Sequence, residues 1–382
     1  MQGRGTFPPL PAYAMAFKSA SELVESRPEL AAFQFDWAAL PGVTGGTTGT
    51  GGRIFCRVED FVVSELSAIQ PSGKGDYVYA YVEKRGLNTH DLVAALRERG
   101  VPYREVGIAG LKDRQAVTRQ WLSVPLGFSE QLSGLDELDG VAVLDMSRHE
   151  SRLRRGQLRG NRFEARVREP EPGWERQAGA IIEGLRQAGL PNYFGPQRFG
   201  RFNSNAIDAV RMLQGEKVPG GKRLNEFFIS ALQAHLFNWN LKRRIESGIY
   251  DRVLTGDRAR RHDTGGMFLV GDGAEESERA QRLEISAALP LYGRKVSGGL
   301  EAAAQHEEAI LTRFGLRRSD FRRHTRGAWR VSRVCPEDIA LRPCTDGYVA
   351  EFTLPSGSYA TTLLRELTKS VSNSAVVSAE TG

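Results

Sequence analysis

The spacing of apolar residues changes twice along this chain, and this change is the feature that most limits its possible folds. Residues 76–83, DYVYAYVE, are β-branched, aromatic or small for most of their length, which is typical of a strand. Residues 224–248, LNEFFISALQAHLFNWNLKRRIESG, instead keep apolar side chains at helical spacing for about six turns. Strand signals return at residues 347–354, GYVAEFTL. This order predicts a more helical domain inserted into an α/β domain.

Shorter segments supply further expected elements. Ile54, Cys56 and Val58 alternate with polar neighbours and predict a strand. A helix is expected between Asn88 or Thr89, which can cap it, and Gly100, which ends it. Further strands are expected at residues 117–124, 141–146 and 163–168, and further helices at residues 175–188, 300–314 and 356–369.

Length and composition define a broad class. The 382 residues suffice for about two domains, and 40% hydrophobic with 26% charged residues is ordinary for a globular protein. The sequence contains no run of eighteen apolar residues, so no membrane span is expected. The three cysteines form no CxxC pair and the six histidines are scattered, which favours a reduced, cytoplasmic protein without a metal site.

The two ends of the chain differ from its middle. Residues 1–35 are rich in Pro, Ala and Ser without clear periodicity, and we expect them to be a mobile N-terminal extension. Residues 372–382 are expected to be a flexible tail. Residues 41–52 are glycine-rich but lack the GxGxxG order of a dinucleotide site, so a loop is expected there.

Positive charge is concentrated in two segments. Residues 147–163 hold six arginines against one glutamate, and residues 313–333 hold eight arginines against one aspartate. These 38 residues carry +12, so the other 344 carry −6 of the net +6. Such concentration favours binding of an extended polyanion, although solvated helix faces are the alternative. The arginines that we expect to bind RNA are Arg152, Arg154, Arg155, Arg198, Arg322 and Arg323.

One carboxylate is the candidate for chemistry. The sequence has no GxxxxGK[ST] and no GxSxG motif, so an enzyme of this sequence would have to work with its side chains alone. Asp113 lies between Lys112 and Arg114 in GLKDRQAV, where positive potential favours the carboxylate form. A charged hairpin turn is the alternative interpretation.

Two other segments combine aromatic and polar residues. In GNRF, Asn161 can hydrogen-bond a base edge or position a loop, and Phe163 can stack on a base. A turn asparagine followed by a core phenylalanine is the alternative. Residues 192–200, NYFGPQRFG, combine aromatics, glycines and Arg198, which fits either ligand contact or a structural connection between domains.

Five segments together resemble a known family. VEDFVVSEL (58–66), AGLKDRQAVTRQW (109–121), GNRF (160–163), PNYFGPQRFG (191–200) and LPSGSYATTLLREL (354–367) resemble, in this order, the TruD family of tRNA pseudouridine synthases. The resemblance extends from about residue 40 to residue 370. Val58 departs from the family, in which a proline is expected before the Glu-Asp pair.

The resemblance implies a fold. It is an α+β fold in which a pseudouridine synthase catalytic domain with a mixed, largely antiparallel sheet carries an inserted, more helical TruD-type domain. The catalytic domain would comprise residues 36–187 and 325–371, and the inserted domain residues 188–324.

The resemblance also implies a reaction. A uridine in the D-arm of tRNA, at position 13, would be flipped out and isomerised to pseudouridine, without cofactor or metal. Asp113 would be the catalytic nucleophile, attacking C6 of the base or C1′ of the ribose. Phe163 would pack on the target base and Asn161 would hold the catalytic loop, while Lys112, Glu65 and Arg114 would also serve substrate binding. Lys112 could serve Asp113 or a phosphate, and an extended loop would favour the phosphate.

The partner is then tRNA, with no membrane, no obligate protein partner and a monomeric state expected. Two other functions remain open on the sequence alone. An RNA-binding or chaperone protein would use the same arginines without needing Asp113. A nucleoside hydrolase or glycosylase would also use a carboxylate at a glycosidic bond, but it would release free uracil.

Overall fold

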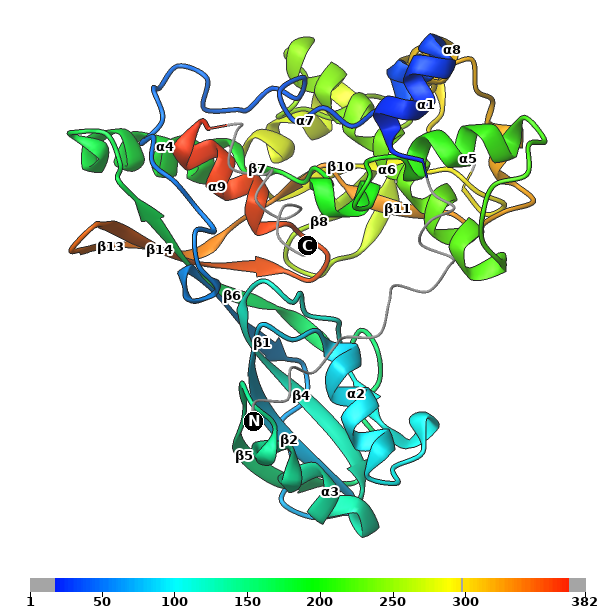
Figure 1. Ribbon diagram of the computed structural model, residues 1–382. Coiled ribbons are helices and arrows are strands. Elements are labelled where there is room, and N and C mark those ends of the chain that lie inside the picture. Colours follow the sequence, from blue (N-terminus) through cyan, green and yellow to red (C-terminus); the bar gives the residue numbers. More distant parts are fainter. Residues whose placement is uncertain (1–17, 297, 371–382) are drawn as a thin grey trace. The chain divides into compact units, whose positions relative to one another are not determined.

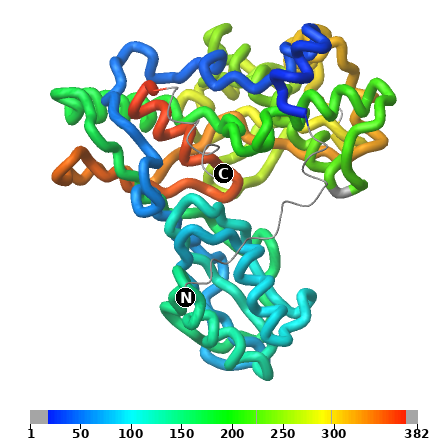
Figure 2. Tube along the Cα trace, in the orientation of Figure 1, coloured from blue at the N-terminus to red at the C-terminus, as the bar shows by residue number. Residues whose placement is uncertain are grey.

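The computed structural model describes residues 18–296 and 298–370 (Figure 1). The chain divides into two compact units. Unit 1 contains the chain up to residue 43 together with residues 191–333, and unit 2 contains residues 44–190 together with the chain from residue 334. The colours of Figure 2 show that each unit combines segments that are distant in sequence. The chain passes from one unit to the other between Val43 and Thr44, and again at the short strands β7 (Leu190–Pro191) and β12 (Arg333–Val334).

Unit 2 is built on an eight-stranded sheet. Seven of its strands follow the order β13-β14-β6-β1-β4-β2-β5, and β3 pairs with β4. The pair β1–β4 is parallel, whereas the other pairs are antiparallel. The strands are β1 (Phe61–Ser67), β2 (Tyr77–Arg85), β3 (Gly107–Ile108), β4 (Val117–Pro125), β5 (Val141–His149), β6 (Leu158–Arg168), β13 (Glu337–Cys344) and β14 (Gly347–Pro355).

Helices complete unit 2. Apolar side chains of α2, α3 and the 3-10 turn at 134–137 form one core with β2 and β4. Trp174, at the start of α4, stacks on Tyr348 of β14, with ring centroids 4.2 Å apart. The helices are α2 (Thr89–Glu98), α3 (Ser129–Ser133), α4 (Trp174–Ala188) and α9 (Ala360–Thr368), with 3-10 turns at Val58–Asp60, Tyr103–Glu105, Leu126–Phe128 and Gly134–Glu137.

Helix α2 begins with a capping box. The Asn88 side chain accepts a hydrogen bond from the Asp91 backbone N–H, and the Asp91 carboxylate accepts one from the Asn88 backbone N–H. These bonds satisfy N–H groups that a helix end otherwise leaves unpaired. Gly100 follows the helix with a φ of 92°, a conformation that glycine adopts without strain. The first residue of α2, Thr89, is thereby fixed, and it contacts the candidate site described below.

Unit 1 combines helices with a second sheet. Its helices are α1 (Ala20–Ser26), α5 (Asn205–Leu213), α6 (Lys222–Glu246), α7 (Gly273–Gln281) and α8 (Glu301–Arg313), with 3-10 turns at Pro28–Phe33, Pro196–Phe199 and Arg318–Phe321. Its sheet has the order β11-β10-β8-β9, formed by Ala328–Val331, Ile285–Leu291, Arg258–Arg261 and Met267–Leu269. The middle of the chain is therefore less purely helical than its apolar spacing predicts.

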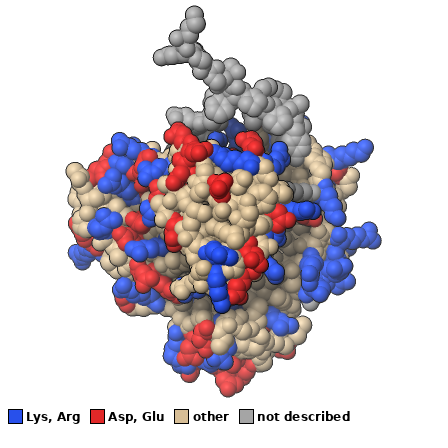
Figure 3. All heavy atoms as spheres, turned by 90° about the horizontal axis from the view of Figure 1, so that it is seen from below, with Lys and Arg blue, Asp and Glu red and all other residues tan. Residues whose placement is uncertain are grey.

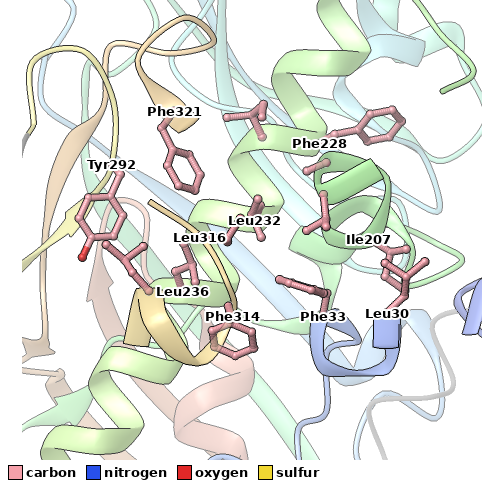
Figure 4. Close-up of a cluster of buried hydrophobic side chains, with 14 of the residues drawn as sticks. Leu30, Phe33, Ile207, Phe228, Leu232, Leu236, Tyr292, Phe314, Leu316 and Phe321 are labelled. Carbon is pink, nitrogen blue, oxygen red and sulfur yellow. The ribbon is translucent and has the colours of Figure 1, made fainter. Parts of the chain in front are cut away.

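The core of unit 1 gathers around α6. Phe228, Leu232 and Leu236 of this helix pack with side chains of α5, α8 and the N-terminal segment (Figure 4). Leu30 and Phe33 belong to the same cluster and are 1% and 7% exposed. In Figure 2 the blue N-terminal helix lies beside the orange segment that contains α8, as the shared cluster requires.

Three expectations need correction. Residues 18–35 are not a mobile extension, because α1 and the following 3-10 turn supply buried apolar side chains to unit 1. Residues 54–58 form no strand; Phe55 has a φ of 59°, and a 3-10 turn leads into β1 at Phe61. Residues 36–43 group with unit 1 rather than with the residues that follow them. Residues 1–17 and 371–382 lie outside the described part of the chain.

Candidate active site

The candidate nucleophile lies in the connection between β3 and β4 in unit 2. Asp113 is an exposed residue in this connection, between the buried Lys112 and the exposed Arg114. Within the described ranges, its carboxylate forms no hydrogen bond or ion pair. The backbone of this connection is fixed by Lys84, whose ammonium group donates a hydrogen bond to the carbonyl of Asp113 at 2.9 Å.

Lys84 is a fully buried lysine. It continues the inward-facing series Val78, Ala80 and Val82 along β2, and it is 0% exposed. Its ammonium group also donates to the carbonyls of Leu87 and, at 3.4 Å, of Lys112. Burial lowers the pKa of Lys84 to about 8, although the nearby Asp113 carboxylate acts in the opposite direction.

Lys112 is bound inside the protein. Its ammonium group lies 3.2 Å from a carboxylate oxygen of Glu65 and donates to the side-chain carbonyl of Asn161 at 2.7 Å. Its backbone N–H donates to the hydroxyl of Thr89 at 2.8 Å, which ties the loop to the start of α2. The expectation of a phosphate contact for Lys112 is not supported, since the side chain is 5% exposed and already paired.

The register of the sheet explains this grouping. Glu65 of β1 lies directly opposite Asn161 of β6, so their side chains emerge on the same face. Glu65 has a fully buried side chain, and burial raises its pKa while the Lys112 ammonium lowers it. The three side chains therefore form a buried cluster next to the Asp113 loop.

Two effects act on the ionisation of Asp113. Desolvation of the carboxyl group by the surrounding protein raises its pKa above the ordinary value, although the residue itself is exposed. The ammonium groups of Lys84 and Lys112 oppose this shift. The expected positive potential is present, but it comes from these two lysines and only partly offsets the desolvation.

Phe163 lies in a row of aromatic rings across three strands. Its ring stacks on Phe61 of β1 at 5.9 Å and on Phe352 of β14 at 5.3 Å between centroids. The residue is 6% exposed, so only a small part of the ring is open to a ligand. It follows Asn161 by two positions on β6 and therefore projects from the same face of the sheet.

An arginine-bearing loop lies beside the Asp113 loop. The backbone N–H of Gly156 donates to the carbonyl of Ala109 at 2.9 Å, and Leu153 of the same loop is buried. Arg154 and Arg155 are exposed between these two anchors. The guanidinium of Arg152 donates to the carbonyl of Arg104.

The expected residues thus separate into two groups. In unit 2, Lys112 pairs with Glu65 and Asn161 next to Asp113, and Phe163 lies two positions after Asn161 on β6. Arg114 instead donates to the carbonyl of Gly86 at 2.9 Å. Arg198, Arg322 and Arg323 lie in unit 1. Arg198 has its guanidinium 5.4 Å from the ring centre of Phe194, and Arg322 and Arg323 are exposed.

Sequence reasoning missed Lys84 and Thr89. Lys84 could have been found from its position: it follows Val78, Ala80 and Val82 at every second residue of β2, so it lies on the buried face, where a lysine is unusual. Thr89 was considered only as a cap, yet its hydroxyl accepts from Lys112 and donates to the side-chain carbonyl of Gln120 at 2.9 Å.

The described residues offer neither a metal centre nor a membrane-spanning helix. Across residues 18–296 and 298–370 there is no group of three or more His, Cys, Asp or Glu side chains that could hold a metal ion. Over the same ranges, no helix has the length and apolar character needed to cross a bilayer. Figure 3 shows one face of the molecule, on which groups of basic side chains alternate with acidic ones.

Comparison with known proteins defines the class as the pseudouridine synthases. The model of the family described as tRNA pseudouridine synthase D (TruD) matches residues 43–217 and 216–367. A tRNA pseudouridine synthase D of Thermus thermophilus is 43% identical over 86% of this chain and 92% of its own length. One of an Anaeromyxobacter species is 42% identical over 86% and 96%. The chain belongs to the TruD family, a family of isomerases.

A solved structure supports the fold. A TruD protein from Methanosarcina mazei superimposes with a TM-score of 0.67 at 23% identity, covering 87% of this chain and 97% of that one. The expected α+β class is thereby confirmed.

Proposed function

We propose that this protein isomerises a uridine in the D-arm of tRNA, at position 13, to pseudouridine, with Asp113 as the nucleophile. The observation that carries the proposal is the Asp113 carboxylate, which is exposed next to two ammonium groups on a loop that the buried Lys84 holds. A carboxylate that is not tied up in an ion pair can attack an electrophilic carbon. The relatives named tRNA pseudouridine synthase D support the substrate class.

The reaction is an isomerisation, so its atoms balance without a co-reactant. The bond between C1′ of the ribose and N1 of the base breaks, and a bond between C1′ and C5 forms. The hydrogen on C5 leaves to water and N1 gains a proton. The carboxylate of Asp113 forms a transient bond either to C6 of the base or to C1′, and it is released at the end.

The surrounding residues have distinct proposed roles. Lys112, bound by Glu65 and Asn161, keeps the loop in position and supplies positive potential to the reacting carboxylate. The exposed part of Phe163 lies against the flipped base. Arg114, already on the Gly86 carbonyl, stabilises the loop and borders the substrate.

RNA binding is assigned to the arginines on both units. Arg152, Arg154 and Arg155 border the Asp113 loop in unit 2, and Arg198, Arg322 and Arg323 provide cations on unit 1. Phosphate contacts would position the RNA, while flipping of one base gives the carboxylate access to it. Unit 2 is proposed as the catalytic domain, and the 191–333 part of unit 1 as the inserted domain, of a monomeric, cytoplasmic enzyme.

The test is product mapping on an unmodified tRNA transcript. We expect the purified protein to convert one uridine, at position 13, to pseudouridine, and a transcript with cytidine at that position to remain unmodified. Chemical probing of pseudouridine followed by sequencing locates the product, and chromatography of the supernatant measures free uracil.

Two outcomes would overturn the proposal. Release of uracil at an abasic site would show a glycosylase. Tight tRNA binding with no pseudouridine in any transcript would show an RNA-binding protein without this catalytic activity.

A further inference from the structure

Two loops of unit 1 that are distant in sequence bring five basic residues together. One is the turn at residues 293–296 after β10, and the other is the segment 321–327 before β11. We call the group the two-loop basic surface, and its members are Arg294, Lys295, Arg322, Arg323 and Arg326. The first two lie outside both arginine-rich segments of the sequence.

Backbone hydrogen bonds join the two loops. The N–H of Arg294 donates to the carbonyl of Thr325 at 2.9 Å, and the N–H of Lys295 donates to that of Arg326 at 2.8 Å. Strands β10 and β11 pair just before this point, up to Leu291 and Ala328. The loops thus continue the pairing of the sheet, and the backbone sets Arg294 and Lys295 beside Arg326, with Arg322 and Arg323 four and three positions earlier on the same segment.

Two glycines permit this close approach. A Cβ atom on Gly293 would lie 2.2 Å from the backbone nitrogen of Gly327, which no real contact allows. Gly327 has a φ of 78°, and a Cβ atom there would lie 2.7 Å from the carbonyl oxygen of Leu291. A side chain at either position would therefore force the loops apart.

Each loop is also anchored in the core. Tyr292 precedes the first turn and Phe321 begins the second segment, and they are 2% and 0% exposed. Their rings lie 5.9 Å apart between centroids, and Figure 4 shows both beside the α6 cluster. The two loops that carry the basic residues are thus anchored to the hydrophobic core of unit 1.

The five side chains are open to a ligand. All are exposed, and among residues 18–296 and 298–370 none of them forms an ion pair or side-chain hydrogen bond. Neighbouring Arg318, by contrast, is paired with Glu307 and Glu308. The nearby carboxylate of Asp320 is occupied in accepting a hydrogen bond from the backbone N–H of Arg317 at 2.8 Å.

We propose that the two-loop basic surface binds the sugar–phosphate backbone of the substrate RNA. The inference rests on the proposed function, because that function supplies an RNA polyanion as the partner. Five cations without acidic partners repel one another, and phosphates relieve this repulsion and release counterions on binding. The proposed contacts are to phosphate oxygens, which position the RNA but carry no sequence information themselves.

The test replaces Arg294 and Lys295 together by alanine. The Kd for tRNA is expected to rise about tenfold, and the slope of log Kd against log salt to fall in magnitude by between about one and two. The kcat at saturating tRNA is expected to stay unchanged, because these residues belong to a different unit from Asp113. Charge reversal of Arg322 and Arg323 on the other loop should act in the same direction.

The matched control replaces Arg261 and Arg282 by alanine. These arginines belong to the same unit and are paired with Asp263 and Glu284, so the net charge changes equally without removing unpaired cations. The Kd and its salt slope should remain close to wild type.

A second variant tests geometry without changing charge. Gly293→Ala keeps all five cations but separates the loops, and it should also raise the Kd, with its thermal unfolding followed to establish that it is folded. Were Arg294→Ala/Lys295→Ala to keep the wild-type Kd and salt slope while product mapping still finds pseudouridine, this inference would fail and the proposed function would stand. If the Arg294→Ala/Lys295→Ala variant lost binding to anionic phospholipid vesicles but kept its affinity for tRNA, the inference would also fail.

Discussion

Lys84 occupies a position that is unfavourable for a lysine unless something compensates for its burial. An ammonium group without solvent loses its hydration, and the lowered pKa of about 8 reflects this cost. Its three carbonyl partners, at Leu87, Lys112 and Asp113, offset part of it. Two of these carbonyls belong to the candidate loop, so we infer that Lys84 is a positioning residue whose charge also acts on Asp113.

Replacing Lys84 by methionine tests both effects. Loss of the donors should lower kcat by about tenfold or more, because a misplaced reacting group is inefficient. Loss of the positive charge should raise the pKa of Asp113 further, so the acid limb of the rate profile should move to higher pH. The measurement is kcat/KM against pH for wild type and variant.

The basic limb supplies an independent check. In wild type the rate should fall above about pH 8 as Lys84 loses its proton, since a neutral amine has fewer hydrogens than its three carbonyls need. The variant should lack this limb. Lys74→Met, at an exposed lysine of the same unit, serves as the control, and identical profiles for all three proteins would refute the positioning role.

At the scale of elements, the N-terminal segment is the clearest departure from expectation. The family model begins at residue 43, yet α1 and the turn at Pro28–Phe33 belong to the core of unit 1. Phe33 packs on Phe314 at 5.4 Å and on His235 at 6.0 Å between ring centres. Burial lowers the pKa of His235 to about 4, as expected for an imidazole enclosed in this cluster.

Phe33→Ala should therefore destabilise unit 1 by about 3–5 kcal/mol, the range typical of a buried phenylalanine that leaves a cavity. Urea unfolding followed by far-UV circular dichroism measures the change. Glu25→Ala, at an exposed position of α1, should change the stability by less than about 0.5 kcal/mol. Equal stability of both variants would mean that the segment is not part of the core.

The same comparison shows what apolar spacing can predict. The sequence predicted α2, α4, α6 and β4 closely, because their periodicity is long and their ends carry capping or glycine residues. Residues 18–35 were misjudged because their few apolar residues bury against helices about 200 positions later. Strands β8 and β9 of unit 1 have only four and three residues, which is too short for an alternation of apolar and polar residues to be recognised.

At the scale of the whole molecule, the candidate site was only partly visible in the sequence. Asp113 stood out through its charged neighbours, and the resemblance identified Asn161 and Phe163. The pairing of Lys112 with Glu65 depends on the register of β1 and β6, which the sequence does not specify. The joining of residues 293–296 with 321–327 likewise depends on how β10 meets β11.

The molecule also separates binding from chemistry. In the proposed function, basic surfaces on both units would contribute many weak phosphate contacts, whereas bond making would depend on the Asp113 carboxylate. Removing the charge of Asp113 should thus leave the affinity for tRNA within a few-fold, since an aspartate does not attract phosphate. It should remove the reaction altogether.

The most direct test is tritium release from tRNA labelled at C5 of uridine, with Asp113→Asn compared with Asp145→Asn, an exposed aspartate of β5 in the same unit. We predict no release above background for the first variant, wild-type release for the second and near wild-type tRNA affinity for both. Normal turnover by Asp113→Asn would contradict the central claim.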